Sequence, residues 1–455
     1  MMRQDLQLEA ASPAVFPAPV RTPKATLAYR ALVMFSWYYF LRPEDFIPGM
    51  DVIPLGKIAG GIALAALVFG TKPKDRGKLP NECKVLLLLL GQMFLTIPFA
   101  FYRGGAYDVV VNKFSKGVIV ALLISMVVTR VIELRKLLYI QSAVVALITV
   151  ASMAVHHTQD GRLMGIQKGI LENPNDLAIN IAINLPLCMA FMFAAKGGFR
   201  KSLWAFALVC MMYAVVATYS RSGMIATVIT LLFCLWEFGI KGRRTMLLMS
   251  AGIIAVISLA VMLVTPKYLV RMESLVRTVP AEAGTLEAHA EGSVEARSQL
   301  LKESVSLMLH NLVFGVGPGN FPVITGEWRV AHNTYTEVGA EAGVPGLLLF
   351  LLLLVMSLRK IRSVRKLPGY ARDENIRLWT SALWAAMAAY IAGAAFASTE
   401  YNLFPYFMVG YICALYKIAS NPNEQTGGTR RNEIVGGQKN LGYDANRERE
   451  LAWSR

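Results

Sequence analysis

The chain has 455 residues, of which 55% are hydrophobic and only 17% are charged, and its mean hydropathy is +0.46. Soluble domains carry about 25% charged residues, so the composition excludes an ordinary soluble globular protein. The formal net charge of +16 does not indicate a nucleic-acid-binding surface, because the cations are spread over short segments between apolar stretches. The composition therefore predicts an all-α polytopic membrane protein.

Apolar stretches long enough to cross a bilayer recur along most of the chain. A transmembrane helix needs about 20 mostly apolar residues to span a hydrocarbon core about 30 Å thick. About twelve such helices are predicted, at residues 26–41, 54–70, 84–102, 114–130, 136–155, 176–195, 202–220, 222–240, 245–264, 343–358, 377–397 and 401–418.

The lysines and arginines predict how these helices are oriented. If the N-terminus is cytoplasmic, 32 of the 46 cations fall in tails and loops on the cytoplasmic side, including the tight basic turns at 196–201 and 241–244. This is the bias that the positive-inside rule requires. Both termini are therefore predicted to be cytoplasmic.

The predicted spans divide the chain into five parts. These are a cytoplasmic tail at 1–25, nine helices at 26–264, one large external loop at 265–342, three helices at 343–418 and a mobile cytoplasmic tail at 419–455. The start is polar and rich in proline, without the short apolar core of a cleavable signal peptide. None of the five cysteines falls in an external loop, so no disulfide or zinc cluster is expected.

The external loop is expected to hold the functional chemistry. Residues 279–292 are rich in Ala, Glu and Gly and predict a flexible surface loop, and 293–309 predict an amphipathic helix with Ser293 as its N-cap. The three glycines and Pro318 within 314–321 predict a turn whose backbone lies close to a neighbour. This run is not a dinucleotide fingerprint, because it follows an amphipathic helix and contains a proline.

Arg297, the 314–321 turn and the segment from His332-Asn333 through Glu341-x-Gly343-x-x-Gly346 together resemble the O-antigen ligase and polymerase superfamily of bacterial envelope enzymes. The resemblance covers about 160–420 and includes Arg162-x-x-Gly165, Asn173-Pro-Asn175 and Ser220-Arg221-Ser222-Gly223. The chain departs from the family where His310-Asn311-Leu312 stands in place of a frequent Asn-Pro. The resemblance implies transfer of a glycan from undecaprenyl diphosphate to an acceptor hydroxyl on the periplasmic face of the bacterial inner membrane.

A lipid-diphosphate donor brings about two negative charges, which guanidinium groups bind with charge-assisted and often bidentate hydrogen bonds. Arg162, Arg221 and Arg297 are predicted to bind the diphosphate, and Arg271, Arg277 and Arg329 are further candidates. The alternative is that arginines at helix ends anchor the protein at the membrane interface or form salt bridges. This alternative is favoured for Arg42 and Arg103.

His332 has two possible roles. A histidine near a helix start can cap backbone amides or pack in a core, whereas an imidazole is also a natural base for a sugar hydroxyl. The family resemblance favours a catalytic His332, while His156, His157, His289 and His310 are expected to be structural or at the surface. Glu337 and Glu341 lie one helical turn apart and are predicted either to orient the imidazole or to bind an arginine. Supporting hydrogen bonds are predicted for Asn333, Tyr335 and Asn175.

Neither a metal nor a nucleotide cofactor is expected. Glu44, Asp45 and Asp51 are the acidic candidates after the first span, and no D-x-D pattern accompanies them. The favoured function is an O-antigen ligase that transfers the glycan to lipid A-core by a metal-independent inverting mechanism.

Three alternatives stay open on sequence alone. Two belong to the same superfamily, a repeat-unit polysaccharide polymerase and a protein O-oligosaccharyltransferase. The third, a lipid or polysaccharide transporter, fits less well, because transporters usually show internal repeats and charges buried in their spans, and neither is evident here.

Overall fold

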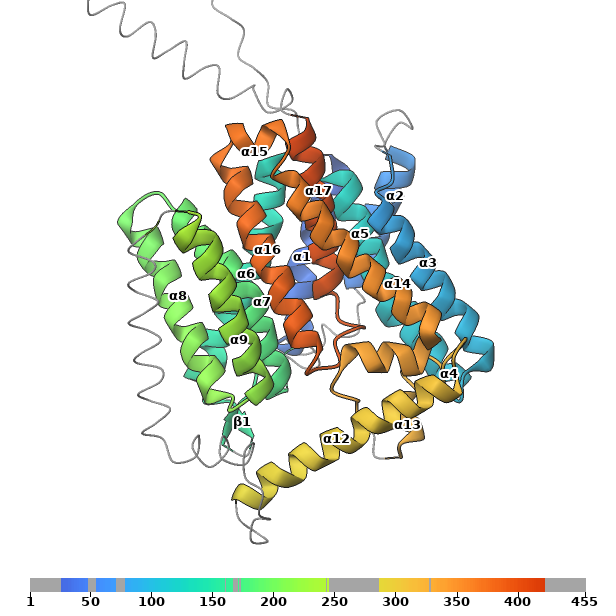
Figure 1. Cartoon of the computed structure of the whole chain (residues 1–455). Coiled ribbons are helices and arrows are strands. Elements are labelled where there is room, and N and C mark those ends of the chain that lie inside the picture. The colour runs from blue at the N-terminus through green and yellow to red at the C-terminus, as the bar shows by residue number, and fades with distance from the viewer. Residues whose placement is uncertain are drawn as a thin grey trace, which may run out of the picture. The chain divides into compact units, whose positions relative to one another are not determined.

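The structure is a computed structural model that describes residues 26–47, 55–70, 78–159, 161–166, 171, 173–242, 244, 286–326 and 329–421. The predicted ninth span, both tails, Asp51, Arg271 and Arg277 lie outside the described residues. Within them the chain is almost entirely helical (Figure 1).

Twelve helices of the described residues form the bundle, and all of them except the short α4 overlap predicted spans. They are α1 (Leu27–Leu41), α2 (Leu55–Gly70), α3 (Asn81–Thr96), α4 (Arg103–Asp108), α5 (Ser115–Val127), α6 (Val131–Ala154), α7 (Pro174–Ala194), α8 (Gly198–Ala217), α9 (Arg221–Cys234), α14 (Thr334–Val364), α16 (Glu374–Ala394) and α17 (Phe404–Ser420). The strands β1 (Thr158–Gln159) and β2 (Arg162–Leu163) pair antiparallel, and three further helices are α12 (Leu286–His310), α13 (Phe321–Ile324) and α15 (Pro368–Arg372). Short 3-10 helices occupy Pro43–Asp45 and Ile97–Phe99, and π-helical turns occupy Val109–Phe114 and Leu235–Ile240.

Among the described residues, seven helical runs are long and apolar enough to cross a membrane. They are Asn81–Phe99, Arg103–Val127, Val131–Ala154, Pro174–Ala194, Gly198–Ala217, Arg221–Ile240 and Thr334–Val364. The prediction of an all-α polytopic membrane protein is confirmed. The number of twelve spans stays a prediction.

Helix α7 forms the centre of the bundle and packs against α6, α8, α9 and α16. Of the 18 most apolar consecutive residues of α7, 83% are buried, whereas the share in α8 is 28%. Leu203, Phe206 and Val209 of α8 are exposed. Phe191 of α7 stacks on Trp204 of α8 and lies against Trp379 of α16. The apolar side chains exposed on α8 are therefore suited to contact lipid, whereas those of α7 form the protein core.

The cationic ends of several helices meet at one end of the bundle, here named the basic end. Lys417 Nζ donates to Met126 O at 3.0 Å, and Lys360 pairs with Glu82. The buried carboxylate of Glu237 on the α9 side binds Arg365 at 2.8 Å and Lys241 at 2.9 Å. Because a buried carboxylate is stable only when it is paired, these ion pairs fix the ends of α9 and α14 together.

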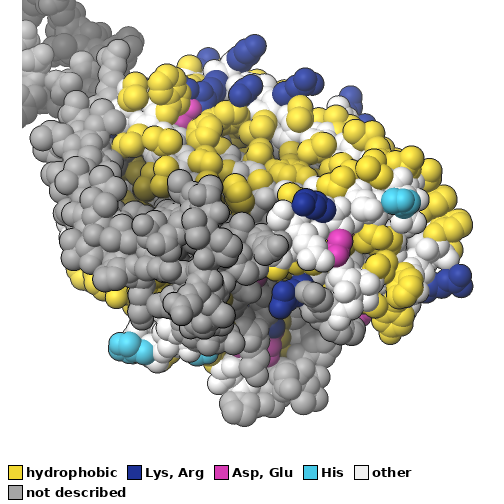
Figure 2. All heavy atoms as spheres, turned by 60° about the horizontal axis from the view of Figure 1, so that its bottom comes forward, with side chains coloured by type: hydrophobic (Ala, Val, Ile, Leu, Met, Phe, Trp, Pro, Cys, Tyr) yellow, Lys and Arg dark blue, Asp and Glu magenta, His cyan; other side chains and the backbone are white. Residues whose placement is uncertain are grey.

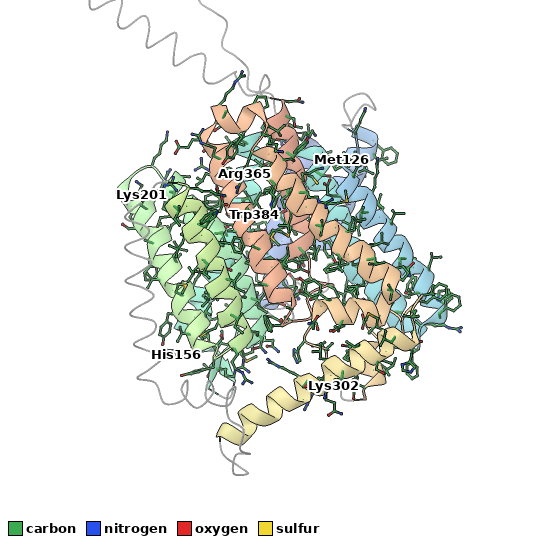
Figure 3. The ribbon with its side chains drawn as sticks, viewed as in Figure 1. Met126, His156, Lys201, Lys302, Arg365 and Trp384 are labelled. Atoms are coloured by element: carbon green, nitrogen blue, oxygen red, sulfur yellow. The ribbon has the colours of Figure 1, made fainter. Side chains whose placement is uncertain are left out.

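The opposite end, here named the loop end, carries the connections at 155–173, 218–221, 311–333 and 395–403. Figure 3 shows Met126, Lys201 and Arg365 at the basic end and His156 and Lys302 at the loop end. Figure 2 turns the loop end forward and shows a broad band of hydrophobic side chains below a row of lysine and arginine side chains. This distribution is typical of a protein whose middle contacts lipid.

The expectation for the start of the amphipathic helix is wrong. Helix α12 begins at Leu286, so Ser293 is not its N-cap and part of the predicted flexible loop at 279–292 is helical. Alanine and glutamate have high helix propensity, which extends the helix through this composition. Helix α14 begins at Thr334, and its helical backbone breaks at Gly343 (φ 71°, ψ 178°), the residue at which the tenth span is predicted to begin.

The two ends predict opposite labelling of exposed cysteines. Lys302→Cys, at the loop end, should react with a membrane-impermeant maleimide added to spheroplasts, and Lys201→Cys, at the basic end, should react only after permeabilisation. The five native cysteines are buried and should contribute little background. The reverse pattern would invert the predicted orientation.

Candidate functional site

The glycine turn at 314–321 lies against the first part of α14. Gly315, Gly317 and Gly319 all have positive φ, at 65°, 98° and 72°. Val316 N donates to Ala340 O at 2.8 Å, and Gly317 N donates to Glu341 O at 3.0 Å. The predicted turn is present, and the neighbour that it approaches is the backbone of the same chain.

Glycine is required in this turn for both conformation and space. A Cβ added at Gly315 would lie 2.4 Å from the carbonyl carbon and oxygen of Glu341, and one added at Gly317 would lie 2.3 Å from the Cβ of Ala100. L-residues other than glycine also avoid the left-handed region. The turn therefore tolerates no side chain at Gly315.

The carboxylate of Glu341 fills the inside of the glycine turn. It accepts hydrogen bonds from Gly319 N at 2.8 Å, from Phe321 N at 3.0 Å and from the hydroxyl of Tyr401. Glu341 is fully buried. No hydrogen bond joins this carboxylate to His332 in the described part of the chain, so Glu341 holds the turn rather than the imidazole.

His332 lies just before α14 in a left-handed backbone conformation, with φ of 55°. The other described residues with positive φ, glycines aside, are Arg42, His156 and Tyr219, of which His156 and Tyr219 also lie in connections at the loop end. Left-handed conformations of non-glycine residues persist only where the surroundings hold them, and they concentrate at functional sites.

The electrostatic surroundings of His332 keep its imidazole neutral. Burial, together with the positive charges of Arg297 and Arg329, lowers the pKa of His332 from 6.5 to about 4. A neutral imidazole has a free lone pair that can accept a proton. The structure thus brings two predicted site residues, Arg297 and His332, close enough to interact electrostatically.

The residues after His332 anchor it to the neighbouring helices. Asn333 caps α14 by accepting from Tyr335 N at 3.0 Å and Thr336 N at 3.1 Å, and its Nδ2 donates to Ala395 O at 3.1 Å. The hydroxyl of Tyr335 donates to Ile391 O at 2.8 Å. Asn333 and Tyr335 therefore position the backbone, and no hydrogen bond joins their side chains to the imidazole in the described residues.

A second group at the loop end forms around Asn175. Its Oδ1 accepts from Arg162 Nη2 at 3.1 Å and from Ser220 Oγ at 2.8 Å, and Arg162 Nε donates to Thr218 O at 2.9 Å. Ser220 caps α9, whose first residue is Arg221. These contacts bring Arg162 and Arg221 to the same corner, where the positive N-terminal ends of α7 and α9 also lie.

The connection after α1 has a different character. Arg42 forms ion pairs with Asp45 at 3.1 Å and Glu44 at 3.7 Å, as the salt-bridge interpretation of Arg42 expects. Two of the three acidic residues considered as metal ligands, Glu44 and Asp45, are thus paired with a cation. The described residues contain no group of three or more His, Cys, Asp or Glu side chains placed to hold a metal ion.

The sequence reasoning missed the loop between α16 and α17. Ser398 donates to Glu337, Thr399 N donates to Thr334 Oγ1, and the hydroxyl of Tyr401 donates to Glu341 in the glycine turn. Glu400 is fully buried, and burial together with Glu337 and Glu341 raises its pKa well above the usual value. The signal that reveals this loop is a polar run between two strongly apolar stretches.

The arrangement is that of a membrane-embedded helical bundle whose loop end combines cationic side chains with a neutral histidine, which suits an anionic substrate and a proton transfer. The family comparison agrees with this class. Residues 206–351 match the family model described as O-Antigen ligase. The chain therefore carries a domain of the O-antigen ligase-like superfamily, as the sequence resemblance predicted. No curated protein and no solved structure matches the chain.

The matched residues run from α8 into α14 and include Arg221, Arg297, the glycine turn and His332. The match supports a glycosyltransferase-like activity of the ligase and polymerase kind on lipid-linked substrates.

The glycine turn gives a stability prediction. Gly315→Ala and Gly326→Ala both place a side chain at positive φ, but only Gly315 lacks space, because nothing lies within 4 Å of a Cβ at Gly326. Gly326→Ala should lower the free energy of unfolding by about 1–2 kcal/mol, because alanine is unfavourable in the left-handed conformation. Gly315→Ala should lower it by about 1–3 kcal/mol more, because the added methyl group also overpacks the turn. Thermal unfolding in detergent measures both. Equal losses would show that the close approach at Gly315 does not matter.

Proposed function

We propose that this protein is an O-antigen ligase of the bacterial inner membrane, with both termini cytoplasmic and the loop end facing the periplasm. It transfers a glycan from undecaprenyl diphosphate to lipid A-core by an inverting mechanism without a metal or nucleotide. The observation that supports this most directly is His332 itself, which lies at the loop end within the family-matched residues and is kept neutral by burial and by the charges of Arg297 and Arg329.

The arginines would bind the donor. Arg162 is preorganised for this role, because Thr218 O and Asn175 Oδ1 fix its guanidinium. Arg221 stands beside it at the start of α9, and Arg297 approaches from α12. Guanidinium groups held in place before the reaction stabilise the charge that develops on the departing diphosphate.

His332 would act as the general base. Its imidazole accepts the proton of the acceptor hydroxyl while that oxygen attacks the anomeric carbon of the donor glycan. The bond between the anomeric carbon and the diphosphate oxygen breaks on the opposite face, and undecaprenyl diphosphate leaves with the bonding electron pair. The imidazolium then releases its proton to water.

The arginines link donor binding to the basicity of His332. An imidazole with a pKa of about 4 is a weak base at neutral pH. A bound diphosphate adds about two negative charges near the same cations and cancels part of their field, which raises the pKa of His332. The base thus becomes stronger when the donor is present.

The same transfer chemistry serves a repeat-unit polymerase and a protein O-oligosaccharyltransferase, which differ from a ligase in their acceptor. Purified protein should be given an undecaprenyl-diphosphate glycan with lipid A-core, a second lipid-linked glycan or a periplasmic protein in separate reactions. Transfer to lipid A-core supports the ligase, and transfer only to one of the others identifies the alternative.

His332→Ala should fold, insert into the membrane and bind the donor, but transfer should fall by about 10²–10⁴-fold, the usual contribution of a general base. Glycan transfer and the thermal shift on adding donor lipid measure the two properties separately.

His310→Ala is the matched control. This exposed histidine ends α12, and its Nδ1 lies 2.8 Å from Ser306 O of the same helix, so its removal should leave most activity. Near-normal transfer by well-folded His332→Ala would exclude His332 as the base.

The pH dependence of transfer should follow the protonation of His332. Activity requires the neutral imidazole, so it is lost as pH falls through the pKa, which lies at about 4 without donor. The acidic limb of the kcat/KM profile reports the pKa of His332 in the free enzyme, and the acidic limb of the kcat profile reports its pKa in the donor complex. The kcat limb should therefore lie at the higher pH.

Arg329→Gln removes one positive charge beside His332, so the pKa rises and the acidic limb of kcat/KM should move to higher pH. Arg42→Gln, at the Glu44 and Asp45 ion pairs, should leave the limb in place. An unchanged limb in Arg329→Gln would contradict the assignment of this titration to His332.

A further inference from the structure

The backbone on both sides of His332 is tied to the loop Ala395–Thr399, which joins α16 to α17. After His332, Thr334 N donates to Ala397 O at 2.9 Å and Thr334 Oγ1 donates to the same oxygen at 2.6 Å. Thr399 N donates back to Thr334 Oγ1 at 2.9 Å. The start of α14 is therefore fixed to this loop.

Before His332, the connection to the same loop passes through Glu337. One oxygen of its carboxylate, Oε2, accepts from Ala331 N at 3.0 Å and from the hydroxyl of Ser398. Glu337 is only 2% exposed. The Ala331 amide lies directly before His332 in the chain, so this bond controls the direction in which the backbone enters the left-handed residue.

The imidazole of His332 has no hydrogen bond within the described residues that would aim its ring. The direction of the ring is then set by the backbone of His332, which holds an unfavourable left-handed conformation. That conformation depends on the hydrogen bonds of Thr334 on one side and of Glu337 on the other. Misplacement of a catalytic group by about 1 Å lowers a rate by about 10²-fold.

We infer that Glu337 is a positioning residue that aims His332, by tying the Ala331 amide to Ser398 of the α16–α17 loop. The inference rests on the proposed function of His332 as the base. Glu337 does not itself take the substrate proton, because it is buried and its Oε2 already accepts two protein hydrogen bonds. Ser398 lies outside the family-matched residues 206–351, so the positioning device extends beyond the matched domain.

The test compares Glu337→Gln with Glu337→Ala. The side-chain oxygen of glutamine can accept both hydrogen bonds without a charge, so Glu337→Gln should keep kcat within about threefold. Glu337→Ala removes the acceptor and should lower kcat by about 10²-fold with the KM for donor unchanged. Transfer from an undecaprenyl-diphosphate glycan to lipid A-core supplies these values.

Hydrogen exchange supplies a readout that does not depend on activity. Deuterium uptake of the peptide containing 329–333 should rise in Glu337→Ala and stay at the wild-type level in Glu337→Gln. Ser357→Ala is the matched control, because this buried serine also lies on α14 but its hydroxyl bonds only within the helix, to Leu353 O. It should change neither kcat nor exchange at 329–333.

If Glu337→Ala does not fold, Ser398→Ala keeps the inference testable. This substitution leaves the bond from Ala331 to Glu337 but removes the hydrogen bond that joins Glu337 to the α16–α17 loop. The kcat should therefore fall by about tenfold, and deuterium uptake at 329–333 should rise.

Two results would overturn the inference. One is an equal loss of transfer in Glu337→Gln and Glu337→Ala while deuterium uptake at 329–333 stays normal in both variants, which would make Glu337 an acid or base. The other is normal exchange and normal kcat in Glu337→Ala, or in Ser398→Ala where that variant replaces it. A third result separates the inference from the proposed function. If deuterium uptake at 329–333 rises in Glu337→Ala but no form of the protein, wild type included, transfers glycan to lipid A-core, the role of Glu337 in positioning the backbone is supported and the ligase function is contradicted.

Discussion

Non-helical backbone that is buried must find its hydrogen-bond partners inside the protein, because neither hydrocarbon nor a packed interior offers water. The loop end of this bundle breaks helical structure at the glycine turn, at His332 and at Gly343, and each break frees backbone groups. Glu341 accepts the amides of Gly319 and Phe321, and Glu337 accepts the amide of Ala331. Side-chain carboxylates thus replace the backbone carbonyls that a continuous helix would supply, and the geometry of the site depends on them.

The loop end combines acidic groups that hold backbone with cationic groups that act on His332. Glu337, Glu341 and Glu400 are buried, and burial together with the other two carboxylates raises the pKa of Glu400. Arg297 and Arg329 help to lower the pKa of His332. The carboxylates of Glu337 and Glu341 thus bind backbone amides, whereas the two arginines act on the imidazole.

Much of this organisation was predictable from sequence, and the rest depended on tertiary contacts. Apolar length and basic loops predicted the helices, and the glycines predicted a turn in close contact with a neighbour. The spacing of Glu337 and Glu341 predicted a shared helical face but could not show what that face meets, which is the turn and the α16–α17 loop. Ser293 satisfied the local rule for an N-cap, yet the Ala- and Glu-rich residues before it continue the helix to Leu286.

The site draws on three separate parts of the chain. Arg162 and Asn175 come from before the family-matched residues 206–351, and Ser398 and Tyr401 come from after them. The matched segment carries His332, Arg221 and Arg297, but its neighbours fix their geometry. The proposed transfer needs a base and a diphosphate-binding group whichever acceptor is used. The proposal therefore assigns the difference between acceptors to the surfaces around His332 that would receive the hydroxyl, and not to the residues that would carry out the transfer.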